Sequence, residues 1–189
     1  TAGCNLACRY CQNWDISKSR DQDTLAVAAT PKAIAARAAE LGCRSVAYTY
    51  NDPVIFLEYA VDTALACRER AIRNVAVTAG YVSPGAREQF FAPMDAANID
   101  LKAFTDDFYH RICGGHLEPV KETLLYLRKE TRVWLELTTL LIPGYNDSDA
   151  ELESMTAWVV DALGPDVPMH FTAHHPDWTL NDTPPPPPD

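Results

Sequence analysis

The chain has 189 residues, the size of one ordinary domain and too short for two domains that each have a core. Hydrophobic residues make up 47% and charged residues 22%, which is typical of a folded chain rather than a disordered one. The net charge of −10 repels phosphate groups, which argues against binding to nucleic acids or membrane surfaces. No stretch approaches the roughly 18 apolar residues that a membrane-spanning helix needs.

Short β-branched runs alternate along the chain with helical patterns. A proline directly after Thr30 and another after Asp52 indicate two helix starts, and Gly42 indicates a helix end. In chain order, the predicted elements are a helix over 31–41, a strand over 45–49, a helix over 53–70, a strand over 74–78, a helix over 84–91, a strand over 97–102, a helix over 118–130, a strand over 133–141, a helix over 149–163 and a strand over 167–172.

This alternation of strands and helices predicts a parallel sheet with right-handed crossovers. The fold class is therefore α/β. Five strands fit either a partial (β/α) barrel or an open doubly wound sheet, and periodicity does not distinguish the two. In the helix over 53–70 we expect Leu57, Val61, Ala64 and Leu65 to form the buried face.

Both ends of the sequence suggest a fragment of a longer protein. The first cysteine follows Thr1 by only three residues, and the chain ends in five prolines and Asp189. Such a proline run favours a polyproline II linker. We therefore expect a core domain over 1–177 that is truncated at both ends, followed by a proline-rich linker or tail over 178–189.

Three of the six cysteines, Cys4, Cys8 and Cys11, have the spacing Cys-x3-Cys-x2-Cys. In a protein that we expect to be cytosolic, such clustering indicates metal or redox chemistry. Soft thiolate ligands select iron–sulfur clusters, zinc or copper(I). A structural zinc site is normally closed by a fourth ligand nearby, whereas the next cysteine here is Cys43. An incomplete ligand set suits a centre that keeps one metal position open, and a zinc site completed by a distant residue is the alternative.

The other cysteines carry weaker signals. We expect Cys43 and Cys67 to be core residues. Cys113 precedes a Gly-Gly pair, and whether it lies near the site is open. His110 and His116 are expected on the surface.

Polar residues lie where two of the predicted strands end. Asn51 and Asp52 stand between a strand and a helix, at the edge where α/β proteins bind ligands, and could accept hydrogen bonds from an ammonium group. A simple helix cap is the other role for Asp52, and both roles are compatible. Alternation places Asp100 and Lys102 on one face of their strand, where charges are costly unless they are paired or functional. A mutual ion pair and a ligand pocket are the two interpretations.

Two further strands carry candidate residues. Glu136 is a candidate for the barrel interior, and a shielded carboxylate at a sheet edge is the alternative. His170, Thr172 and His174 alternate along the last strand, where neighbouring histidines raise the odds of a site above those of a lone buried histidine.

The cysteine spacing, with an aromatic residue before the third cysteine, resembles the signature of the radical S-adenosylmethionine (SAM) superfamily. Within it, the sequence looks most similar to the AmmeMemoRadiSam-system branch, relatives of the pyruvate formate-lyase activating enzymes. The segments that carry the resemblance are Cys-Gln-Asn-Trp-Asp-Ile-Ser at 11–17, Tyr-Thr-Tyr-Asn-Asp-Pro at 48–53, Asn-Ile-Asp-Leu-Lys-Ala-Phe-Thr-Asp at 98–106, Glu-Leu-Thr-Thr-Leu-Leu-Ile-Pro-Gly-Tyr-Asn-Asp at 136–147 and His-His-Pro-Asp at 174–177.

The resemblance implies a [4Fe–4S] cluster that is bound by Cys4, Cys8 and Cys11 as catalytic metal ligands, with SAM chelating the fourth iron. Reductive cleavage of SAM would yield a 5′-deoxyadenosyl radical that abstracts hydrogen from a substrate. The family also implies a first barrel strand before the cysteine loop, which we expect this chain to lack. The residues expected to bind SAM are Asn13, Asn51, Asp52, Thr78, Asp100 and Lys102.

The resemblance further implies a cytoplasmic enzyme with a reducing partner such as flavodoxin or ferredoxin. The substrate would be an unidentified small molecule or protein. One alternative is an activase that abstracts hydrogen from a backbone glycine of a partner protein. An alternative of another class is a zinc-binding structural or interaction module, which would be colourless and hold one tetrahedral metal ion.

Overall fold

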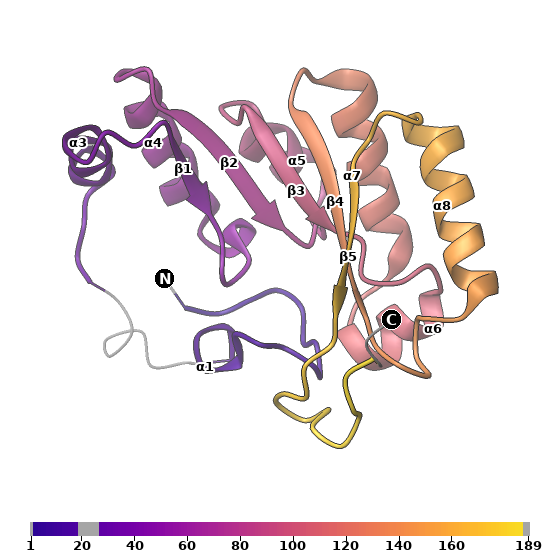
Figure 1. The fold of residues 1–189 in the computed structure, drawn as a ribbon. Helices are drawn as coiled ribbons and strands as arrows, with labels where there is room; N and C mark the ends of the chain where they lie inside the picture. The colour runs from indigo at the N-terminus through magenta and orange to yellow at the C-terminus, as the bar shows by residue number, and fades with distance from the viewer. Residues whose placement is uncertain (1, 19–26, 187–189) are drawn as a thin grey trace.

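The computed structural model describes residues 2–18 and 27–186. They form a five-stranded parallel sheet with helices packed against one face (Figure 1). The strands, in both sequence and spatial order, are β1 (Ser45–Tyr48), β2 (Arg73–Thr78), β3 (Ala96–Asp100), β4 (Trp134–Leu141) and β5 (Met169–Ala173).

The strand order distinguishes between the two architectures that the sequence left open. Every strand pairs with the next strand along the chain, so the order runs in one direction from β1 to β5. A doubly wound sheet would reverse this order at a switch point. The fold is therefore an open, partial (β/α) barrel, and the α/β prediction is confirmed.

The predicted strands and helices are all present, and their bounds differ from the predictions by a few residues. Helix starts follow the expected local chemistry: the hydroxyl of Thr30 accepts a hydrogen bond from the N–H of Ala33, at 3.2 Å. Three short elements, α1, α6 and η2, were not predicted. The helical elements are α1 (Trp14–Ser17), α3 (Pro31–Glu40), the 3-10 turn η1 (Pro53–Phe56), α4 (Leu57–Arg68), α5 (Pro84–Phe91), α6 (Asp106–Phe108), the wide helical turn η2 (Tyr109–Cys113), α7 (Leu117–Glu130) and α8 (Asp149–Leu163).

The main core lies between the sheet and its helices. Along β3 and β4 alternate residues are buried, among them Ile99 and Leu137, and Leu124 of α7 and Met155 of α8 belong to the same cluster. The side chains between them in sequence face the other, open side of the sheet. This alternation leaves that face free to carry polar groups.

Helices α3 and α4 form a smaller cluster beside the first strands. Ala35 and Ala38 of α3 pack near Cys67 of α4 and Ile72, and the small alanine side chains allow the two helices to approach closely. The prediction that Cys67 is a core residue is confirmed.

Two predicted core residues are exposed. Leu65 faces outward because the buried stripe of α4 runs through Leu57, Ala60 and Ala64, and Leu65 lies one residue beyond it. Cys43 is exposed because it lies in the connection between α3 and the edge strand β1. Both predictions were wrong.

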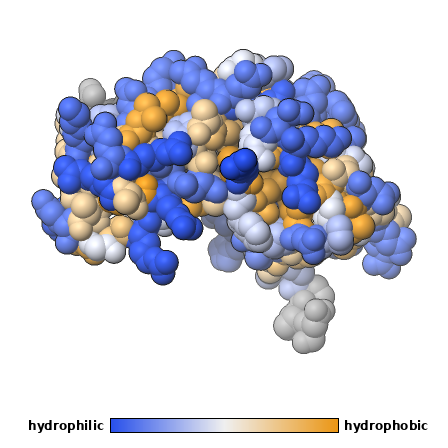
Figure 2. Space-filling view, turned by 90° about the horizontal axis from the view of Figure 1, so that it is seen from above, coloured by the Kyte–Doolittle hydropathy of each residue, from blue (hydrophilic) through white to orange (hydrophobic). Residues whose placement is uncertain are grey.

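The two ends of the sheet differ in what surrounds them. The carboxyl ends of the strands point toward the N-terminal cysteine loop and the C-terminal segment, which lie below the arrowheads in Figure 1. Figure 2 views the molecule from above, at the opposite end, where hydrophilic side chains predominate and apolar ones are scattered. None of the described helices is long and apolar enough to cross a membrane.

Candidate functional site

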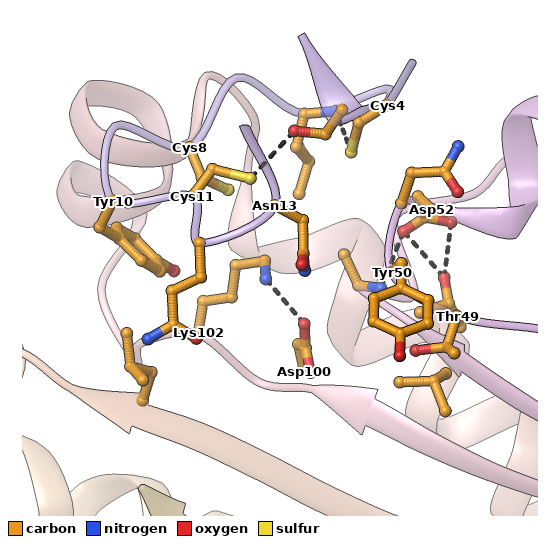
Figure 3. Close-up of a pocket in the computed structure, with 18 of the residues that line it drawn as sticks. Cys4, Cys8, Tyr10, Cys11, Asn13, Thr49, Tyr50, Asp52, Asp100 and Lys102 are labelled. Carbon is orange, nitrogen blue, oxygen red and sulfur yellow. Dashed lines mark hydrogen bonds and ion pairs between the residues drawn. The ribbon is translucent and has the colours of Figure 1, made fainter. Parts of the chain in front are cut away.

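A pocket of about 290 Å³ opens between the cysteine loop and the carboxyl ends of the strands (Figure 3). This volume is near the lower end of the range typical of ligand pockets. All nine residues that the sequence singled out for the cluster and for SAM line it: Cys4, Cys8, Cys11, Asn13, Asn51, Asp52, Thr78, Asp100 and Lys102. Residues from four separate segments of the chain are thus brought to one place.

The cysteine loop is held on one side by the end of η2. The N–H groups of Ala7 and Arg9 donate to the carbonyls of Cys113 and Ile112, at 2.7 and 2.9 Å. This close approach requires small residues, because a Cβ on Gly115 would lie 2.7 Å from Leu6 Cδ2. The Gly-Gly pair that follows Cys113 therefore lets the cysteine loop pack against η2.

The C-terminal segment holds the other side of the loop. The N–H groups of Thr179 and Leu180 both donate to the carbonyl of Arg9, each at 3.0 Å. The ring of Trp178 stacks on that of Trp14, with centroids 4.9 Å apart. Leu180 is 1% exposed and belongs to the main core. Core packing thus continues past residue 177, where the sequence analysis placed the end of the core. The sequence did not indicate this, because residues 178–180 are too few to show a periodic hydrophobic pattern.

The three thiols of the loop lie in different surroundings. The Cys11 Sγ lies 3.0 Å from the Ser17 hydroxyl. Burial raises the pKa of the Cys4 thiol. A hydrogen bond with the Cys113 thiol, together with the nearby ammonium groups of Lys102 and Lys18, lowers the pKa of the Cys8 thiol to about 6.

Three thiols on one loop, all lining one pocket, are a donor set that suits an iron–sulfur cluster. Among residues 2–18 and 27–186, no three histidine, cysteine, aspartate or glutamate side chains are gathered closely enough to hold a metal ion.

Asp52 links the ends of β1 and β2. Its carboxylate accepts hydrogen bonds from the hydroxyl of Thr78, at 2.8 and 3.0 Å, from the N–H of Ala79, at 2.9 Å, and from the N–H of Val54, at 3.1 Å. Burial raises the pKa of Asp52, and these hydrogen bonds partly offset that effect. Asp52 therefore caps η1 and lines the pocket at once, as the sequence allowed.

Asn51 connects the cysteine loop to the sheet. Its side-chain amide donates to the carbonyl of Gly3, at 2.9 Å. Gly3 has a φ of 98°, a conformation that favours glycine, and a Cβ there would lie 3.0 Å from Ile55 Cδ1. Asn13 reaches the same pocket from the turn that begins α1.

Asp100 and Lys102 form an ion pair of 2.9 Å where β3 ends. Burial would by itself lower the pKa of Lys102, but the negative charge of Asp100 and the neighbouring Tyr10 and thiol groups outweigh it and hold that pKa well above its ordinary value. The mutual pair and the pocket position, which the sequence offered as alternatives, occur together.

The other candidates lie in several places. Glu136 and His170 pair at 2.9 Å on the open face of the sheet, away from the pocket lining. Thr172 reaches the pocket, whereas His174 is buried in the main body of the molecule, and burial lowers its pKa. His110 and His116 are exposed, as predicted.

Sequence reasoning missed Lys18 and Tyr50, which also line the pocket. The ammonium group of Lys18 donates to the carbonyl of Leu6 across the cysteine loop, at 3.0 Å. Tyr50 has a φ of 78° and a 71% exposed side chain at the pocket mouth, and its ring lies beside Asp52 in Figure 3. A basic residue just after the cysteine motif was the available signal for Lys18, and nothing local indicated the conformation of Tyr50.

Comparison with known proteins identifies relatives of this chain. Residues 1–155 match the family described as the radical SAM superfamily. The chain is 40% identical over 186 residues to an uncharacterized protein of Methanocaldococcus jannaschii, across 98% of this chain and 54% of that protein. The chain spans about half the length of the curated relatives it matches.

Two solved structures show the same fold. The structure of Streptococcus suis SuiB bound to S-adenosylmethionine aligns with a TM-score of 0.72 and 13% identity, over 95% of this chain and 41% of that one. A domain of the pyruvate-formate lyase-activating enzyme from Bacteroides vulgatus aligns with a TM-score of 0.56 and 16% identity, over 67% of this chain and 74% of that one.

Proposed function

Because the chain belongs to the radical SAM superfamily, we propose that Cys4, Cys8 and Cys11 bind a [4Fe–4S] cluster and that SAM binds beside it in the pocket. Such a cluster supplies the electron for reductive cleavage of SAM, and the resulting 5′-deoxyadenosyl radical abstracts hydrogen from a substrate. The observation that carries the proposal is that three cysteines of one loop line the same pocket as Asp52 and Lys102.

The charged residues of the pocket match the two charged groups of an amino acid. A carboxylate has about four acceptor positions, and Asp52 receives three hydrogen atoms from Val54, Thr78 and Ala79, which leaves one position for an ammonium group. The ammonium group of Lys102 is a partner for a carboxylate. Asp52 would therefore bind the ammonium group of the methionine part of SAM, and Lys102 would bind its carboxylate. Together the two side chains would orient this part of the ligand.

The remaining pocket residues position the ligand and limit contact with water. Asn13, Asn51 and Thr78 contribute polar groups from three different elements. Leu6 and Leu140 contribute apolar surface to the same pocket. Exclusion of water strengthens electrostatic contacts and protects reactive species from side reactions.

The substrate is proposed only as a class. The resemblance to the AmmeMemoRadiSam-system branch favours an unidentified small molecule or protein as the hydrogen donor. A reducing partner such as flavodoxin or ferredoxin would supply the electron, and free clustered thiols favour a cytoplasmic location.

Anaerobic reconstitution tests the proposal. We expect about four irons and matching sulfide per chain, as a four-iron cluster requires, and 5′-deoxyadenosine after reduction with dithionite. Cys8→Ala should lose both, whereas Cys43→Ala removes an exposed thiol outside the pocket and should keep both. Stoichiometric zinc without 5′-deoxyadenosine would identify a structural metal module instead. A glycyl radical on a partner protein would assign the activase reaction.

A further inference from the structure

Ser17 of α1 lies against the cysteine loop and contacts one of its thiols. Its hydroxyl oxygen lies 3.0 Å from the Cys11 Sγ, a contact drawn as a dashed line from the Cys11 sulfur in Figure 3. Both residues line the pocket, and Ser17 is only 5% exposed. The contact between hydroxyl and thiol is therefore largely shielded from water, where hydrogen bonds are electrostatically stronger.

Backbone hydrogen bonds fix the position of Ser17 beside the loop. The N–H group of Ser17 donates to the carbonyl of Asn13, at 2.8 Å, which closes the turn of α1 directly after the cysteine motif. The N–H group of Gly3 donates to the carbonyl of Ile16, at 3.0 Å, and ties this turn to the start of the loop. The Ser17 hydroxyl is thus held beside Cys11 by the backbone on both sides of the motif and not by the thiol alone.

The direction of this hydrogen bond is set once the sulfur binds a metal. Between a hydroxyl and a thiol, either group can donate. A cysteine that binds iron is a thiolate, which has no proton to give. The Ser17 hydroxyl must then be the donor, and a hydrogen bond to a charged acceptor is stronger than one between neutral groups.

We propose that the Ser17 hydroxyl donates a hydrogen bond to the Cys11 sulfur in the cluster-bound protein and thereby raises the reduction potential of the cluster. This inference rests on the proposed function, because it requires a cluster that is bound through Cys11. Hydrogen bonds to the sulfurs are among the factors that set such a potential. One-electron reduction adds negative charge, which a donor stabilises, so the reduced form becomes easier to reach. Ser17 acts through Cys11 and is a positioning residue, not a ligand.

The test is the midpoint potential of the reconstituted protein without SAM, measured by electron paramagnetic resonance at a series of poised potentials. Ser17→Ala and Ser17→Gly both remove the hydroxyl and should keep their iron and shift the potential to a more negative value. Ser17→Thr keeps a hydroxyl and should restore most of the shift. Thr63→Val is the matched control, because it removes a buried hydroxyl on α4 outside the pocket and should leave the potential unchanged.

A second measurement detects the donated proton itself. The hydroxyl proton of Ser17 exchanges with water, so electron–nuclear double resonance of the reduced cluster can be compared in ordinary and deuterated water. The unmodified protein and Ser17→Thr should show an exchangeable coupling that Ser17→Ala lacks. A merely structural role of Ser17 would not remove this coupling alone.

Three results separate the possible failures. An unchanged or more positive potential in an iron-loaded Ser17→Ala variant would overturn the proposal, and so would an unchanged set of exchangeable couplings. Loss of iron from folded Ser17→Ala and Ser17→Gly variants would also overturn it, because Ser17 would then be needed for binding of the cluster. Failure of the unmodified protein to assemble a cluster would contradict the proposed function instead.

Discussion

Two pairs of polar side chains on the open face of the same sheet have the same length and different surroundings. Asp100 and Lys102 pair at 2.9 Å at the carboxyl end of β3, and Glu136 and His170 pair at 2.9 Å nearer the amino ends of β4 and β5. The two carboxylates are equally exposed, at 37% for Asp100 and 36% for Glu136, but the Lys102 side chain is 13% exposed, whereas that of His170 is 51% exposed. The cysteine loop borders the pocket that holds the first pair, and the second pair lies outside that pocket.

The comparison shows that the distance between two paired side chains does not by itself decide what the pair contributes. Charges interact more strongly where water is excluded, and removing one partner of a buried pair leaves the other uncompensated. An exposed pair contributes at most about 1 kcal/mol. The carboxyl end of the sheet should therefore be sensitive to substitution and the amino end tolerant.

The largest effect is expected at Lys102. In Lys102→Met the pocket loses its ammonium group and Asp100 loses its partner, so SAM affinity should fall about 30-fold or more, as for truncation of one partner of a buried charged pair. Equilibrium binding to the reconstituted protein measures this. Lys102→Arg keeps the charge and should retain more affinity, and His170→Gln should leave it unchanged. An equal loss of SAM affinity in the Lys102→Met and His170→Gln variants would show that the two ends of the sheet do not differ in this way.

The next effect is expected in the segment that closes the carboxyl end. Leu180→Ala should lower the free energy of unfolding by about 2–4 kcal/mol, because it truncates a fully buried side chain and leaves a cavity. Urea unfolding measures the change. Val160→Ala truncates a half-exposed side chain of α8 and should cost well under that amount. A Leu180→Ala variant as stable as the unmodified protein would show that the 178–180 segment is not part of the core.

Asp52 and Glu136 allow the same chemical change to be compared at the two ends. Asp52→Asn replaces one carboxylate oxygen with an amide NH₂, which then faces the N–H group of Val54 or of Ala79. A buried donor left without an acceptor costs about 1–3 kcal/mol. We expect urea unfolding at neutral pH to show a loss in this range, and a loss near zero would argue that Asp52 is not needed to join β1 and β2.

The smallest effect is expected for Glu136→Gln, at most about 0.5 kcal/mol at neutral pH, because its partners lie on an exposed surface. Hydrogen bonds from Trp134 and His170 lower the pKa of Glu136 below its ordinary 4.5. Its contribution is therefore present above pH 4.5 and is lost as the pH falls through the lowered value in the folded protein. Urea unfolding of the two proteins at neutral and acidic pH should show the small difference disappear in acid. A difference that grows in acid would contradict this assignment.

Local sequence signals were enough to predict the strands and the main helices. These signals act within a few residues and can therefore be recognised in the sequence alone. They include the cap at Thr30, the prolines at helix starts and the alternating burial along β3. The same holds for the cysteine spacing and for the polar residues at strand ends, because parallel strands bring their carboxyl ends to one edge of the sheet.

What the tertiary structure alone decided depends on contacts between distant segments. The sequence left the barrel and the doubly wound sheet equally open, and only the pairing of each strand with the next one chose between them. Likewise, Cys113 lies beside Cys8, and Leu180 lies against the cysteine loop, through hydrogen bonds that join segments more than a hundred residues apart in the chain. Periodicity and capping carry no information about such contacts, because the free energy that forms them comes from packing of the whole core. The sequence by itself therefore determined the elements and the ligand loop, and the fold decided which side chains surround that loop.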